Sequence, residues 1–167
     1  MAPESKKIKG LPILVASPVD VGRLVREIES MNEMFMQLSL RKPGAEVKMP
    51  KTSRLMDQTI LLNELNLLLS EDRLLLQQFL RAVKERAPVI HASFNADPPV
   101  AFMEKLVSWL RQEVNPLVLV TIGLQPNMGA GCVLRTTNRQ FDFSLRENFA
   151  KKRELLTSML HVEETAA

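Results

Sequence analysis

The chain has 167 residues, of which 46% are hydrophobic and 25% charged, and 22 Lys+Arg against 19 Asp+Glu give a formal charge of +3. These proportions are typical of a soluble globular protein, and so small a basic excess does not by itself predict nucleic-acid binding. The single cysteine excludes an internal disulfide and a Cys-based zinc cluster, and no apolar run approaches the ~20 residues of a membrane span.

The first part of the chain is dominated by helical patterns. We expect a disordered tail over residues 1–10 and a short strand over 11–15, an apolar run too short for the core of a signal peptide. Ser17 and Pro18 then start a helix. Its apolar residues recur every three or four positions, on one face: Val21, Leu24, Val25, Ile28, Met31 and Phe35.

A basic loop is expected over residues 41–53, which contain Pro43, Gly44 and Pro50. A second helix should run from about 53 to 69 and a third from 73 to about 86, with a cap at 70–72 and Pro88 preventing continuation. Both helices carry leucines on more than one face. This pattern indicates either packing onto the neighbouring region or an interface with another chain.

The second part alternates strands and helices. Strands are predicted at 89–94, 117–122, 130–135 and 140–143, the second of them buried on both faces, with a hairpin tip at 136–139. One helix follows Asp97-Pro98-Pro99, and a last helix runs from the capping box Ser144 to Glu147 as far as about His161. We therefore predict an α+β fold: a helical region over 11–87, then a small mixed-sheet α/β domain over 88–162 that ends in a long helix.

Residues that carry chemistry are few. Cys132 lies in a predicted strand among apolar neighbours, where an inert thiol is expected, and His91 and His161 share no metal-ligand spacing. The glycines of Gly129-Ala130-Gly131 do not belong to a phosphate-binding loop, because no GxxxxGK[ST] pattern is present. We expect a non-enzymatic protein without metal or cofactor, in a reducing cytoplasmic setting.

The two segments LQPNMGAGCVLR (124–135) and FDFSLR (141–146) together carry a resemblance to a known family. They resemble the C-terminal signature of the delta subunit of F-type ATP synthases, the family of the oligomycin-sensitivity-conferring protein, over about residues 74–160. The matching positions are Pro126, Met128, Gly131, Val133, Leu134, Arg135, Asp142, Ser144, Leu145 and Arg146. Gln125 and Ala130 depart from the family pattern, and the N-terminal part is shorter than the family's helical bundle.

The resemblance implies a non-catalytic subunit of the peripheral stalk, or stator, of a proton-translocating ATP synthase. Such a subunit links the b subunits to the catalytic head, where the N-termini of the alpha subunits are possible partners. It lies on the cytoplasmic face of the inner or plasma membrane and meets the membrane only through the complex. The signature residues Pro126, Gly131, Arg135, Asp142, Ser144 and Arg146 are then structural. The candidate partner interface consists of Met103, Leu106, Leu110, Phe149, Leu156 and Leu160.

An alternative is a small RNA-associated module. The pI of about 9.2 and the basic stretches at 41–54 and 146–153 favour it. Aromatic residues make up only 5% of the chain, with no tyrosine, so bases would find few stacking partners. The stator reading, without nucleic acid, is therefore preferred.

Overall fold

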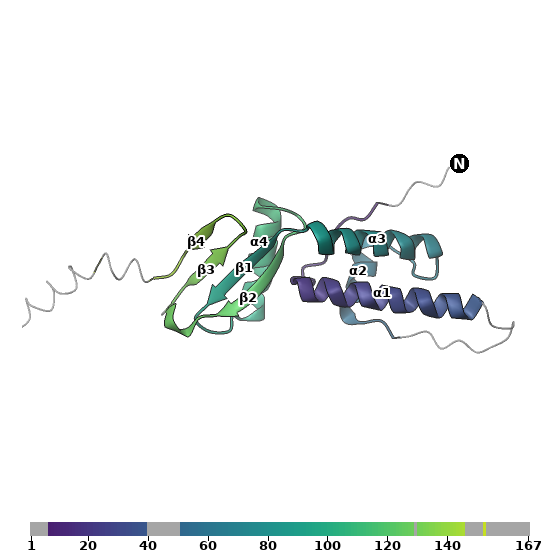
Figure 1. The fold of residues 1–167 in the computed structure, drawn as a ribbon, viewed down its shortest axis with the longest axis horizontal. Helices are drawn as coiled ribbons and strands as arrows, with labels where there is room; N and C mark the ends of the chain where they lie inside the picture. Colours follow the sequence, from purple (N-terminus) through teal and green to yellow (C-terminus); the bar gives the residue numbers. More distant parts are fainter. Residues whose placement is uncertain (1–6, 40–50, 129, 146–151, 153–167) are drawn as a thin grey trace, which may run out of the picture. The chain divides into compact units, whose positions relative to one another are not determined.

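The computed structural model describes residues 7–39, 51–128, 130–145 and 152 (Figure 1). In chain order the elements are α1 (Pro18–Ser39), α2 (Arg54–Asn63), α3 (Ser70–Arg86), β1 (Val89–Phe94), α4 (Val100–Glu113), β2 (Leu119–Leu124), the 3₁₀ turn η1 (Pro126–Met128), β3 (Cys132–Arg135) and β4 (Gln140–Asp142). This content confirms the predicted α+β class. Within the described ranges, no helix is long and apolar enough to span a bilayer.

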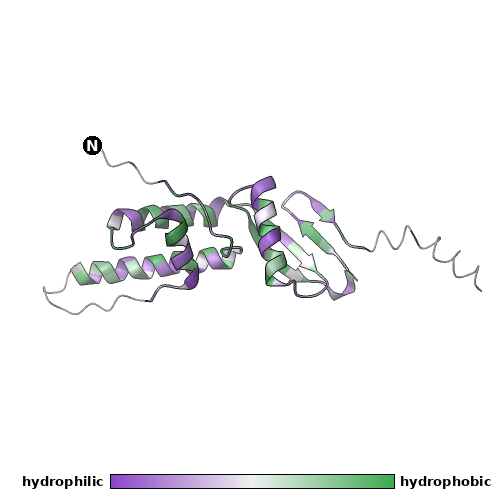
Figure 2. Ribbon diagram, turned by 180° about the vertical axis from the view of Figure 1, so that it is seen from behind, coloured by the Kyte–Doolittle hydropathy of each residue, from purple (hydrophilic) through white to green (hydrophobic). Residues whose placement is uncertain are grey.

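The chain forms two compact units. The first comprises Met1–Val89 and Ala101–Val120, and the second comprises Ile90–Val100 and Thr121–Ala167. Helix α4 and the start of β2 thus belong with the helical region, so a simple boundary at 87/88 does not separate the units. The core of the first unit gathers apolar residues of α1, α2 and α3 together with Leu11, Val15 and Leu119. In Figure 2 hydrophobic and hydrophilic colours alternate along these helices, as expected where one face is buried.

Helix α1 starts where the sequence predicts. The Ser17 N–H and Oγ–H both donate to Asp20 Oδ2, at 3.1 and 2.7 Å, while Asp20 N–H donates back to Ser17 Oγ at 3.2 Å. These reciprocal bonds satisfy free donors at the helix start. The expected apolar face is buried from Val21 to Met31, and Phe35 is partly buried.

Helix α2 ends earlier than predicted. Instead of continuing to residue 69, it stops at Asn63, and Glu64 adopts the left-handed conformation with φ 52°. The predicted cap at 70–72 is also wrong, because α3 begins at Ser70 after Leu69, which offers no capping side chain. The Asp72 carboxylate instead accepts a bond from Asn66 N–H at 2.8 Å and holds the connecting turn.

The strand expected over residues 11–15 is absent from the described part of the chain. Residues 7–16, called the strap below, instead form an irregular segment whose main chain is bound by two side chains. Asn63 accepts from Lys9 N–H (2.7 Å) and Gly10 N–H (3.1 Å) and donates to Gly10 O (3.1 Å). Arg111 of α4 donates to the carbonyls of Leu11 (3.0 Å), Pro12 (2.9 Å) and Val15 (2.6 Å). Lys9 and Gly10, expected in a disordered tail, are therefore tied to α2.

The sheet has the strand order β2-β1-β3-β4 and is mixed. Strand β3 is antiparallel to both neighbours, with Ala92 opposite Leu134 and Leu134 opposite Phe141. Strand β1 has the predicted limits. Strand β2 starts two residues later than predicted, and only its first two residues, Leu119 and Val120, are fully buried. Ile122 is 45% exposed, so the expected burial of both faces is wrong beyond Val120.

Candidate functional site

The two signature segments form one hairpin in the structure. Val133 pairs with Asp142, and Arg135 pairs with Gln140 across β3 and β4. The predicted tip closes through Thr136 N–H, which donates to Arg139 O at 2.8 Å. Residues that the sequence places in separate halves of the signature are therefore neighbours.

Gly131 is the point of closest approach between the halves. Its φ of +100° is a conformation that L side chains rarely adopt. A Cβ at this position would lie 2.4 Å from Phe143 O and 2.7 Å from Ser144 Cα. Main-chain bonds flank the contact, from Phe143 N–H to Cys132 O at 2.8 Å and from Leu145 N–H to Ala130 O at 3.0 Å. Only glycine lets these backbones meet.

The Asp142 and Ser144 pair shapes the end of β4. Ser144 N–H donates to Asp142 Oδ1 at 2.7 Å, and Ser144 is only 7% exposed. The predicted capping box pairs Ser144 with Glu147. Glu147 lies outside the described residues, as does the signature residue Arg146. Pro126 begins η1, and the turn before it is fixed by Gln125 N–H, which donates to Phe94 O at 2.7 Å.

Cys132, expected to carry an inert thiol, lies on β3 opposite Phe94 of β1. Burial, with a smaller contribution from the Asp142 carboxylate, raises the pKa of the Cys132 thiol and favours its unreactive form. His91 is exposed on β1, opposite Arg135 rather than Cys132. In the ranges that the structure describes, no three His, Cys, Asp or Glu side chains gather as a metal site would require.

The predicted partner residues of α4 are only partly accessible. Leu110 is 2% exposed and belongs to the core, while Met103 and Leu106 are half-buried. Trp109, which the sequence analysis did not select, is 51% exposed. Phe149, Leu156 and Leu160 lie outside the described residues.

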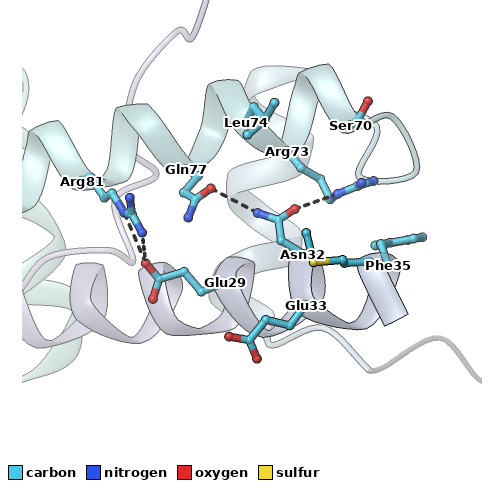
Figure 3. A pocket seen from close by; sticks show the side chains of 10 residues that line it. Glu29, Asn32, Glu33, Phe35, Ser70, Arg73, Leu74, Gln77 and Arg81 are labelled. Carbon is cyan, nitrogen blue, oxygen red and sulfur yellow. Dashed lines mark hydrogen bonds and ion pairs between the residues drawn. The ribbon is translucent and has the colours of Figure 1, made fainter. Parts of the chain in front are cut away.

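A groove of about 820 Å³ lies between the antiparallel helices α1 and α3 (Figure 3), and we call it the α1–α3 groove. Side chains cross-link its two walls at successive turns. Arg81 Nη2 lies 2.5 Å from Glu29 Oε1, and Asn32 Nδ2 donates to Gln77 Oε1 at 3.2 Å. The lining residues are Glu29, Asn32, Glu33, Phe35, Met36, Ser70, Arg73, Leu74, Gln77 and Arg81.

Arg73 is the most extensively bonded residue that lines this groove. Its guanidinium is buried and donates to Asn32 Oδ1 (2.9 Å), Leu67 O (2.7 Å) and Leu68 O (3.0 Å). It also lies 4.1 Å from the centre of the Phe35 ring, a cation–π contact. Arg73 thereby joins the turn between α2 and α3 to helix α1.

The electrostatics of the groove combine a paired and an accessible carboxylate. The hydrogen bond from Arg81 is the main cause that holds the pKa of Glu29 below its ordinary value. Glu33, Met36 (70% exposed) and Leu74 (54% exposed) also line the groove and are exposed. The exposed apolar side chains Met36 and Leu74 suit contact with the apolar face of an amphipathic helix.

No protein-family model matches the chain, and no curated protein matches it either. Its function must therefore be argued from the hairpin and the groove themselves.

Three residues that organise the fold were missed in the sequence. The sequence analysis singled out none of Asn63, Arg73 and Arg111. Asn63 and Arg111 bind main-chain atoms of the strap that are 53 to 100 residues away, and Arg73 binds the distant Asn32 side chain together with the nearby carbonyls of Leu67 and Leu68. A polar residue interrupting a leucine-rich run, as Asn63 does, was the available signal.

Proposed function

We propose that this chain is a non-catalytic peripheral-stalk subunit of an F-type ATP synthase, which links the b subunits to the catalytic head. The observation that carries the proposal is the packing of Gly131 against Phe143 and Ser144. It joins the two segments that carry the resemblance to the delta subunit, through a close approach of backbones that requires glycine at position 131.

The departures from the signature are compatible with the proposal. At Gln125 and Ala130 the structural bonds come from the main chain, from Gln125 N–H to Phe94 O and from Leu145 N–H to Ala130 O. Replacing an aspartate or a glycine at these positions leaves those bonds in place. The hairpin can thus keep its form without the usual side chains.

A stator must resist torque, which requires durable contacts rather than a reaction centre. The α1–α3 groove offers a surface for a helix of the catalytic head, with Met36 and Leu74 exposed in its lining. Helix α4 offers Trp109 as an anchor for a b subunit, because large aromatic side chains often dominate the binding energy of interfaces.

The decisive experiment is purification of the tagged full-length chain from its native cell, followed by mass spectrometry. We expect the alpha, beta and b chains of the ATP synthase to be recovered. Recovery of none of them, with the tagged chain intact and abundant, would refute the proposal.

Variants then separate the two surfaces. Leu74→Glu should reduce recovery of head subunits, and Trp109→Ala should reduce recovery of the b subunit. Val19→Glu is the matched control, because Val19 is 60% exposed on α1 but does not line the groove. If the control lost the same partners, the assignment of the groove would be wrong.

A further inference from the structure

The hairpin sheet has an open polar face that the stator proposal does not use. A groove of about 830 Å³ lies on it, inside the second compact unit. The lining residues include His91, Gln125, Asn127, Arg135, Gln140 and Asp142. We call it the polar sheet groove.

An imidazole and a guanidinium lie on adjacent strands in this groove. His91 and Arg135 are direct partners on β1 and β3, and both are exposed. Opposite residues in an antiparallel pair point to the same face, with Cβ atoms about 4.5–5.5 Å apart. Their side chains can therefore reach one ligand group.

The Arg135 guanidinium is held in place by its neighbour. Nε and Nη2 both donate to Gln140 Oε1, at 3.3 and 2.9 Å. Within the described residues nothing accepts from Nη1, so those donors are available to a carboxylate. A guanidinium oriented in advance loses less rotamer freedom on binding.

We propose that the polar sheet groove binds an acidic peptide segment of a partner protein, with a carboxylate held between His91 and Arg135. The amide side chains of Gln125 and Asn127 on the wall suit a peptide main chain. Leu124 and Met128 suit an apolar side chain next to the acidic one.

The same lining disfavours nucleic acid. Among the described residues of the groove there is no Phe, Trp or Tyr on which a base would stack. Asp142, two residues along β4 from Gln140, places a like charge near any anionic ligand, so the carboxylate is expected at the Arg135 end of the groove.

The test is a titration of the isotope-labelled full-length chain, followed by NMR, with capped hexaglutamate as the probe. Capped hexaglutamine and a thymidine hexanucleotide are the comparison probes. We expect hexaglutamate to shift the amide signals of His91, Arg135 and their strand neighbours, and hexaglutamine to shift none. No shift on β1 or β3, equal binding of hexaglutamine, or tighter binding of the oligonucleotide would each overturn the proposal.

Variants add a matched control. Arg135→Gln should weaken hexaglutamate binding at least about fivefold, because a charge-assisted bond is lost. Arg139→Gln, in the same hairpin but outside the groove, should change it less than about twofold. Equal loss in both variants would mean only non-specific attraction to the basic hairpin and would refute the site.

A third variant tests the sign of the charge effect. Asp142→Asn keeps an oxygen to accept from Ser144 N–H while removing the negative charge. Hexaglutamate should then bind about twofold more tightly, as expected for one charge removed at a distance of several ångströms in water. Unchanged or weaker binding, with the spectrum of the fold preserved, would count against the proposed orientation.

Discussion

Replacing Gly131 by alanine tests whether the hairpin depends on close backbone contact. The new Cβ would lie 2.4 Å from Phe143 O, whereas real Cβ contacts essentially never fall below 3.0 Å, so backbone must move. The φ of +100° adds strain of about 1–3 kcal/mol for a residue with a side chain. Weakening either flanking main-chain bond adds about 0.5–1.5 kcal/mol. We expect a total loss of about 2–4 kcal/mol.

The assay is urea unfolding of the full-length chain, with hydrogen exchange of the Phe143 and Leu145 amides as a local measure. Gly123→Ala is the matched control, because its Cβ would meet only Ser93 Oγ at an ordinary 3.5 Å. Gly22→Ala on α1 meets nothing within 4 Å and should stabilise by up to about 1 kcal/mol. A Gly131→Ala variant as stable as the wild type, with unchanged amide exchange, would refute the reasoning.

Other side chains give further expectations. Arg73→Met removes the guanidinium donors to Leu67 O and Leu68 O and should lower the free energy of unfolding by about 2–4 kcal/mol, measured in urea. Arg111→Met frees the strap carbonyls and should cost about 1.5–3 kcal/mol; no faster amide exchange in the strap would contradict its role. Folding lowers the pKa of Glu29, so the ionised carboxylate stabilises the folded chain. The free energy of unfolding of the wild type should therefore exceed that of Glu29→Gln above pH 4.5, and the difference should disappear as the pH falls through the pKa of the folded state. Because the pKa of Cys132 is raised, iodoacetamide at pH 8 should alkylate the folded chain more slowly than the urea-unfolded chain; equal rates would contradict the burial argument.

Local rules predicted the elements that depend on neighbouring residues. The start of α1 follows from Ser17, Pro18 and Asp20, which lie within a single helical turn. The limits of β1 and the closed tip at 136–139 likewise follow from short-range patterns. The α+β class then follows from the order of these elements.

Contacts between distant parts of the chain explain what was missed. Leucines continue the helical pattern from residue 65 to 69, yet α2 ends because Asn63 binds Gly10 and Arg73 binds the carbonyls of the turn. Arg73 is only five and six residues from the turn carbonyls, whereas Asn63 and Gly10 lie 53 residues apart, so no window of neighbouring residues contains that pair. The same holds for Leu110, whose apolar character fits a partner surface and a core equally well until the packing is known.

The sequence predicted the hairpin of the candidate site but not the α1–α3 groove. The signature residues Gly131 and Asp142 were selected in advance, and their local bonds follow from glycine and Asx-turn chemistry. The α1–α3 groove depends instead on polar pairs such as Arg81 with Glu29, which are 52 residues apart. Hydrophobic periodicity does not detect such pairs.

The way in which the strap is bound determines which substitutions the protein should tolerate there. Asn63 and Arg111 recognise amide and carbonyl groups that every residue type possesses, apart from the missing N–H of proline. The side chain at Lys9 is therefore free to change, whereas Gly10, with φ +151°, and the buried Leu11, Pro12 and Val15 are constrained by backbone conformation and packing. In a saturation library, we expect Asn63 and Arg111 to tolerate few substitutions and Lys9 to tolerate most.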